Sequence, residues 1–198
     1  MKLIGVLLAA GRSTRMGRPK QLLSWPPNSP EAKPLVAAAF DAIARVCDEM
    51  VVVVGHQADE ILAALGARAF HRTNGNPKSE LFSSIRLGLA MARHLDAFAA
   101  VLLQPADHPD VRCETLEALV TAANAHPDRA VMPQFRGRGG HPVLIPPPVA
   151  QLICGYAGMG GLRQFWLDYP ELCLRLPVDD PGVVFDIDTP TDYDASDI

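Results

Sequence analysis

Strand-length apolar runs alternate along this chain with segments whose apolar residues recur at helical spacing. The runs lie at residues 2–8, 50–55 and 97–104, and helical spacing is seen at 34–46 and 113–125. Continuous apolar runs indicate strands that are covered on both faces. The alternation therefore predicts an α/β fold of three layers, with a mostly parallel sheet between helices on both faces. The same criteria predict a helix at 58–66, a strand at 68–71 and a helix that begins near residue 83.

Length and charge limit the functional class. The 198 residues suit one domain that spans residues 1–198. No apolar run approaches the roughly 20 residues that a membrane-spanning helix needs, so we expect no membrane partner. The formal net charge of -4 gives no overall basic field for nucleic acid. An anionic ligand would have to be held locally.

The first residues, MKLIGVLLAAG, are similar to a secretory signal in their basic start and apolar run. The apolar part is short, however, and the pattern that follows favours a buried first strand. The four cysteines are far apart and form no CxxC pair, which argues against a zinc site or a disulfide framework. We therefore expect a cytoplasmic protein.

The segment LLAAGRSTRMGRPKQLL, residues 7–23, runs from the first strand into a glycine-containing turn rich in positive charge. The spacing of Gly11 and Gly17 fits neither the dinucleotide fingerprint G-x-G-x-x-G nor the Walker A loop. What remains is a general anion cradle, in which glycines let backbone N–H groups approach the ligand. A triphosphate would suit this loop, and a solvated basic turn is the alternative. The cationic side chains are those of Arg12, Arg15, Arg18 and Lys20.

This loop resembles the signature of the MobA-like NTP transferase family, nucleotidyltransferases related to the molybdenum cofactor enzymes, with the pattern L-A-[AG]-G-x-S-x-R-M-G-x-x-K. The resemblance implies a Rossmann-like nucleotidyltransferase fold in which the loop backbone holds a nucleoside triphosphate. It implies catalytic roles for Lys20 and Arg15, because fixed positive charge stabilises the negative charge that develops on the α-phosphate and the leaving pyrophosphate. The nucleotide-binding residues that it implies are Leu8, Ala9, Ala10, Gly11, Arg12, Ser13, Gly17 and Lys20.

The segment LLQPADHPDV, residues 102–111, places Asp107 just after an expected strand. It resembles the family motif A-D-x-P, whose aspartate holds magnesium, and this makes Asp107 the third expected catalytic residue. Mg²⁺ prefers one or two carboxylates together with phosphate oxygens and water. Taken alone, Asp107 would also fit a turn or a helix N-cap beside Pro109. The neighbouring His108 and Asp110 fit a solvated loop.

Near the end, VVFDIDTPTDY, residues 183–193, matches the closing motif D-I-D-T-P-x-D of the family. The segment predicts a strand that ends at Asp186 and a helix whose first residue is Pro190. Thr189 and Asp192 have the spacing of a capping box, which gives both a structural role.

Two aspartates of the closing motif are candidates for a metal site. Asp186 and Asp188 alternate along the expected strand and should point to opposite faces, so only one of them can readily join Asp107. We expect Asp188 to bind Mg²⁺ with Asp107, and Asp186 is the alternative. Two carboxylates and the triphosphate would complete the coordination of the ion.

The segment GRGGHPVLI, residues 137–145, resembles a G-x-x-G-H-P-V-L segment of the cytidylyltransferase branch. Its adjacent glycines would let a ligand approach the backbone, and His141 would then contact the acceptor. A structural role is the alternative for this histidine.

Two further segments are assigned to the acceptor side by the same resemblance. Ser83 and Ser84 lie in a stretch that is similar to a family segment contacting the base and the acceptor, although Leu81 replaces an expected glycine. Capping a helix is the alternative for these serines. Arg163, in GMGGLRQFW, would meet the phosphate of the acceptor, and a place on the surface is its alternative.

Together these motifs imply an enzyme that moves CMP from CTP onto the terminal phosphate of molybdopterin and releases pyrophosphate, with Mg²⁺ as cofactor. The attack on the α-phosphorus would be in line, without a covalent enzyme intermediate. Ala9 and Ala10 favour cytidine, because relatives that transfer guanylyl groups usually have LAGG instead of LAAG. A molybdenum hydroxylase would receive the product. The open alternatives are GTP as donor, a sugar 1-phosphate or methylerythritol phosphate as acceptor, and a carrier without catalysis.

Overall fold

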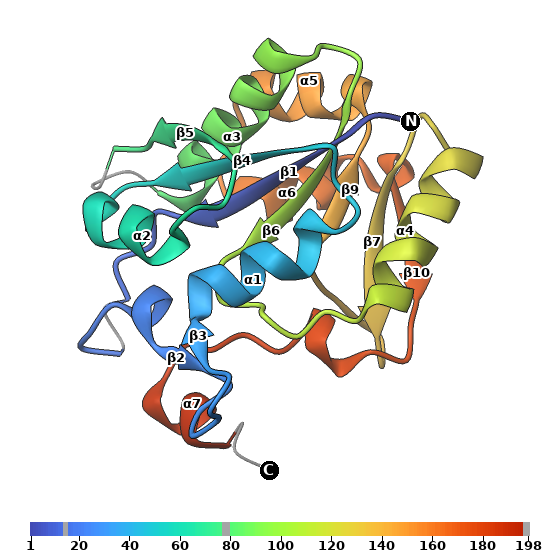
Figure 1. Cartoon of the computed structure of the whole chain (residues 1–198). Helices are drawn as coiled ribbons and strands as arrows, with labels where there is room; N and C mark the ends of the chain where they lie inside the picture. The colour runs from blue at the N-terminus through green and yellow to red at the C-terminus, as the bar shows by residue number, and fades with distance from the viewer. Residues whose placement is uncertain (14–15, 77–79, 196–198) are drawn as a thin grey trace.

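An eight-stranded sheet forms the centre of the molecule in a computed structural model that describes residues 1–13, 16–76 and 80–195 (Figure 1). Seven of its strands follow the order β10-β7-β9-β6-β1-β4-β5, and β8 pairs with β7. One side of the sheet is parallel and consists of β1 (Leu3–Ala9), β4 (Glu49–Val54), β5 (His71–Asn74) and β6 (Ala100–Pro105).

The other side of the sheet is mixed. There β10 (Cys173–Pro177) runs parallel to β7 (Ala130–Phe135), whereas β9 (Val143–Ile145) is antiparallel to both β6 and β7. The short β8 (Arg138–Gly139) is antiparallel to β7. The predicted α/β class with a mostly parallel sheet is confirmed.

Helices cover both faces of the sheet, as Figure 1 shows. Strand β1 explains the arrangement, because its alternate residues are buried on opposite faces: Leu7 packs in one core cluster and Val6 in the other. The first cluster is covered by α1 (Leu35–Ala44), α2 (Ala58–Leu65) and α4 (Cys113–Ala125). The second is covered by α3 (Leu81–Leu95), α5 (Pro147–Gly155) and α6 (Gly161–Asp168). None of the helices in the described ranges combines the length and apolar character needed to cross a bilayer.

A small separate core holds the C-terminal segment against the N-terminal half. It lies beside a two-stranded sheet of β2 (Ser24–Trp25) and β3 (Lys33–Pro34). Trp25 and Ile187 are buried in this core, and Phe185 packs against it. The last helix, α7 (Pro190–Ala195), is tied to β2 because the Tyr193 hydroxyl donates a hydrogen bond to the Ser24 carbonyl at 2.7 Å. The short 3₁₀ helices are η1 (Lys20–Leu22), η2 (Pro170–Leu172) and η3 (Pro181–Val183).

The prediction of a strand that ends at Asp186 is wrong. The chain forms η3 there and continues as a loop through residues 185–188. Pro181 begins the turn, and the Asp180 side chain accepts a hydrogen bond from the Gly182 N–H at 2.9 Å. These local interactions fix a turn in place of a paired strand. The strand predicted at residues 68–71 lies later in the sequence, since β5 begins at His71.

Gly88 sets how closely α3 approaches the sheet. A Cβ atom at this position would lie 2.5 Å from Val6 Cγ1 and 3.0 Å from Val53 Cγ2. Both valines are fully buried in the parallel centre of the sheet and have little freedom to move. The absence of a side chain at position 88 therefore allows the helix backbone to pack directly on β1 and β4.

We expect Gly88→Ala to lower the free energy of unfolding by about 1–3 kcal/mol, since overpacking outweighs the better helix propensity of alanine. Urea denaturation measures this. Gly155→Ala is the matched control, because Gly155 ends α5 and a Cβ atom there would meet nothing within 4 Å. An equal effect of both substitutions would contradict the packing role of Gly88.

Candidate active site

A cavity of about 590 Å³ opens where the parallel strands β1 and β6 end. This is the edge at which ligands bind in open α/β sheets. Its walls come from the loop after β1, the loop after β6, the start of α3 and the C-terminal segment. The predicted site residues that line it are Leu8, Ala10, Gly11, Arg12, Ser13, Lys20, Ser84, Asp107, His141 and Asp188, and Asp186 joins them.

Some predicted residues lie elsewhere. Ala9 is completely buried within the sheet, and Gly17 and Ser83 are exposed outside the lining of this cavity. Arg163 lines a neighbouring cavity. Arg15 lies outside the described residues.

The two serines of α3 do not cap the helix. Helix α3 begins at Leu81, and its N-cap residue is Glu80. Ser83 and Ser84 therefore occupy the first turn. Ser84 is buried and faces the cavity, so only the second of the two serines is available to a ligand there.

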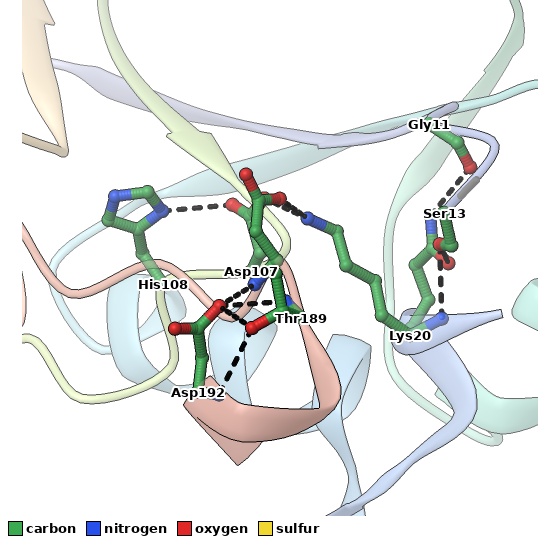
Figure 2. A network of polar contacts seen from close by, with 9 residues as sticks. Gly11, Ser13, Lys20, Asp107, His108, Thr189 and Asp192 are labelled. Carbon is green, nitrogen blue, oxygen red and sulfur yellow. Dashed lines mark hydrogen bonds and ion pairs between the residues drawn. The ribbon is translucent and has the colours of Figure 1, made fainter. Parts of the chain in front are cut away.

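A buried glutamine braces the loop after β1. The Gln21 amide donates to the Gly11 carbonyl at 2.8 Å and accepts from the Ser13 hydroxyl at 3.0 Å. The same Ser13 oxygen accepts the Lys20 N–H at 3.0 Å, so both ends of the loop are joined (Figure 2). Gln21 was not predicted, because a polar residue beside Lys20 gives no sign in the sequence that it is only 3% exposed.

The Lys20 ammonium lies between two carboxylates. Its Nζ is 2.6 Å from Asp107 Oδ2 and 2.6 Å from Asp188 Oδ1. Figure 2 shows the lysine side chain reaching from its loop to the end of β6. The backbone of the two aspartate loops is also joined, because the Ile187 N–H donates to the Asp107 carbonyl at 3.2 Å.

The charges of this cluster stabilise one another. Burial lowers the pKa of Lys20, but the charge of Asp107 and hydrogen bonds to both aspartates raise it above its ordinary value. Burial raises the pKa of Asp107, but the hydrogen bond from His108 and the charge of Lys20 hold this pKa well below its usual range. Lys20 and Asp107 are therefore both charged at neutral pH.

The predicted capping box is confirmed, and it fixes the segment that carries Asp188. The Asp192 carboxylate accepts hydrogen bonds from the Thr189 N–H at 2.7 Å and from the Asp188 N–H at 3.1 Å. The Thr189 hydroxyl in turn accepts the Asp192 N–H at 3.3 Å. Helix α7 begins at Pro190, as predicted.

Asp188 is the aspartate of the closing motif that joins Asp107 at Lys20. Asp186 and Asp188 do not alternate along a strand as expected, because residues 185–188 form a loop. Asp186 is exposed and lines the same cavity. No cluster of three or more His, Cys, Asp or Glu side chains suited to a metal occurs in the described part of the chain. A divalent cation here would take Asp107 and Asp188, and its other ligands would come from substrate and water.

The adjacent glycines before His141, Gly139 and Gly140, line the neighbouring cavity. A Cβ atom at Gly140 would lie 2.2 Å from the Val183 carbonyl oxygen, so this glycine makes room for the chain itself. The His141 N–H donates to the same carbonyl at 2.7 Å. Burial, followed by the charge of His108, lowers the pKa of His141 to about 4. A neutral imidazole thus lies beside the cavity.

A second cavity, of about 690 Å³, adjoins the first. The two cavities share Leu8, Leu81, Pro105 and His141 in their linings. The far wall of the second cavity comes from α6 and from β10, which contribute Arg163 and Arg175. Trp166, which is only 6% exposed, also lines this cavity.

The family assignment follows from comparison with known proteins. A family model described as the MobA-like NTP transferase domain matches residues 5–172, which include the loop, Lys20 and Asp107. This chain belongs to the MobA-like NTP transferase family. It is therefore a nucleotidyltransferase, and the cluster around Lys20 lies where the signature loop of the family meets the end of β6.

Curated relatives of this MobA-like protein carry different names. It is 22% identical over 190 residues to the molybdenum cofactor cytidylyltransferase of Escherichia coli, covering 95% of this chain and 92% of the relative. It is 32% identical over 151 residues to a molybdenum cofactor guanylyltransferase of Pseudomonas aeruginosa, covering 75% and 70%. It is 29% identical over 199 residues to a nicotine blue oxidoreductase of Paenarthrobacter nicotinovorans, covering 93% and 91%.

Solved structures support the same fold. Rv0371c from Mycobacterium tuberculosis superposes with a TM-score of 0.81 and 26% identity, covering 98% of this chain and 97% of that one. A manganese complex of Rv0371c superposes with a TM-score of 0.73 and 23% identity, covering 99% and 98%. The Rossmann-like nucleotidyltransferase architecture of the MobA-like chain is thus confirmed.

We expect Asp192→Ala to lower the free energy of unfolding by about 0.5–2 kcal/mol, because the Asp188 and Thr189 N–H groups lose their acceptor. Urea denaturation provides the measurement. Asp194→Ala is the control, since Asp194 is exposed in the same helix. Equal stability of the two variants would contradict a capping role for Asp192.

Proposed function

We propose that the whole chain works as one domain that transfers CMP from CTP onto the terminal phosphate of molybdopterin and releases pyrophosphate. The observation that carries the proposal is that Lys20, Asp107 and Asp188 meet at the carboxyl ends of the parallel strands in a nucleotidyltransferase. Cytidine is favoured by the LAAG sequence at residues 8–11 and by the name of the E. coli relative. The names of the guanylyltransferase relatives make GTP the alternative donor.

The triphosphate would bind at the loop after β1. Gly11, Arg12 and Ser13 line the cavity there, and the brace made by Gln21 fixes their backbone before any ligand arrives. Preorganised N–H groups and cations bind phosphate oxygens without a reorganisation cost at the moment of reaction. The loop lacks the G-x-G-x-x-G spacing typical of dinucleotide sites, which favours transfer over redox chemistry.

Asp107 and Asp188 fit a Mg²⁺ ion, because they already place two carboxylate oxygens around one cation, the Lys20 ammonium. When bound, the ion would neutralise charge on the α-phosphate and the leaving group. Lys20 would then be released from the carboxylates and could pair with the phosphates. Its positive charge would stabilise the transition state more than the bound substrate.

The acceptor would bind in the second cavity. Apolar side chains, Trp166 among them, line it, and Arg163 and Arg175 offer charge for a phosphate. Neutral His141 lies in the lining of both cavities and would contact the acceptor near the reacting phosphates. Ser84 lines the first cavity and would contact the acceptor from that side.

The reaction balances without a covalent enzyme intermediate. An oxygen of the acceptor phosphate forms a bond to the α-phosphorus of CTP while the bond to the pyrophosphate oxygen breaks. Pyrophosphate leaves with the negative charge of that bond. The enzyme would contribute position and charge, which the two adjoining cavities and Lys20 supply. The product would pass to a molybdenum hydroxylase in the cytoplasm, where the four free cysteines would stay reduced.

Nucleotide selectivity tests this function first. With Mg²⁺ present, we expect CTP to raise the melting temperature more than GTP, ATP or UTP, because a ligand of the native state stabilises it. Asp107→Asn should reduce the shift. Pyrophosphate release from CTP should then require molybdopterin. A larger shift with GTP would favour transfer of GMP. Failure to release pyrophosphate from either CTP or GTP would contradict the transferase activity on this acceptor.

Lys20→Met should lower kcat by about 10²–10³-fold, since it removes a charge aimed at the developing negative charge. The dissociation constant of the nucleotide should change by less than about tenfold. Steady-state kinetics and calorimetry measure the two quantities. Lys33→Met is the control, because Lys33 pairs with Asp41 at 2.6 Å and lines neither cavity. A loss confined to nucleotide affinity would contradict the catalytic role.

A further inference from the structure

His108 is a buried histidine whose ring contacts the candidate metal ligand. Only 7% of the residue is exposed, and its Nδ1 lies 2.9 Å from Asp107 Oδ1 (Figure 2). A carboxylate that forms an ion pair with the Lys20 ammonium can only accept, so the proton of this hydrogen bond belongs to His108 Nδ1. Because the ring is buried, the prediction that His108 lies in a solvated loop is wrong.

The two oxygens of Asp107 have different partners. Oδ1 accepts from the His108 ring, whereas Oδ2 contacts the Lys20 ammonium at 2.6 Å. This division fixes the plane of the carboxylate. It leaves Oδ2, which points toward Asp188 across the ammonium, as the oxygen available to a cation.

The His108 ring is itself held in place. The backbone carbonyl of His108 accepts a hydrogen bond from the buried Gln104 amide at 2.5 Å, which anchors the backbone of the loop to β6. Its ring packs edge-to-face on the His141 ring, with centroids 5.1 Å apart. A side chain fixed at both ends can orient its neighbour, in the way that outer hydrogen bonds orient metal ligands.

We propose that His108 is a positioning residue, which aligns the Asp107 carboxylate for the divalent cation by donating its Nδ1–H to Oδ1. The proposal rests on the metal site of the proposed function. His108 contacts no cation itself and acts only through Asp107. Outer-shell partners of this kind typically change metal affinity by about 10–100-fold when they are removed.

Three substitutions separate positioning from packing. His108→Asn keeps an N–H close to the position of Nδ1, His108→Gln moves it toward the position of Nε2, and His108→Leu removes it. Binding of Mn²⁺ in the presence of CTP or GTP, without acceptor, is measured by electron paramagnetic resonance. We expect the Mn²⁺ dissociation constant to rise about 10–100-fold in the Leu and Gln variants and to stay near the native value in the Asn variant.

Urea denaturation of the same variants accounts for packing. His94→Leu, at an exposed position in the last turn of α3, is the control for loss of an imidazole. Equal Mn²⁺ affinities in the Asn and Gln variants, whatever their stabilities, would overturn the positioning role. If the native chain took up no Mn²⁺ with either nucleotide, the metal site would itself be wrong and the inference would fail with it, so the two failures are distinguishable.

Discussion

The ion pairs of Lys20 with Asp107 and Asp188 join three parts of the chain that are far apart in sequence. Two carboxylates so close together would repel each other without a cation between them. Lys20 supplies this cation and draws the signature loop, the end of β6 and the C-terminal segment onto one cavity. The same arrangement would suit a divalent ion, as in the proposed metal site.

The rest of the fold supplies the stiffness that this cluster needs. Buried β1 and β6 end side by side in parallel, which brings the loops that carry Lys20 and Asp107 to one edge. Asp188 has no such strand behind it. Its loop is held by the packing of Ile187 beside Trp25 and by the capping box that opens α7. The small separate core around Trp25 and Ile187 thus supports Asp188 in place of a strand.

The sequence predicted the features that depend on local pattern. Apolar runs placed the parallel strands β1, β4 and β6, and motif resemblance selected Lys20, Asp107 and Asp188, which the structure brings together. Features that depend on tertiary neighbours were missed. His108 was expected in a solvated loop, whereas its ring is buried against Asp107. The room that Gly140 leaves for the Val183 carbonyl is a contact across 43 residues that no local spacing reveals.

The Lys20 cluster also determines how ligands would enter. A divalent cation alone has to displace the ammonium from both carboxylates, and the displaced charge then has no partner. A triphosphate alone draws Lys20 away and leaves Asp107 and Asp188 facing each other. If both ligands bound, the cation could pair with the carboxylates and Lys20 with the phosphates, so each ligand would favour the binding of the other. The proposed site would in this way bind the metal and the nucleotide together more readily than either alone.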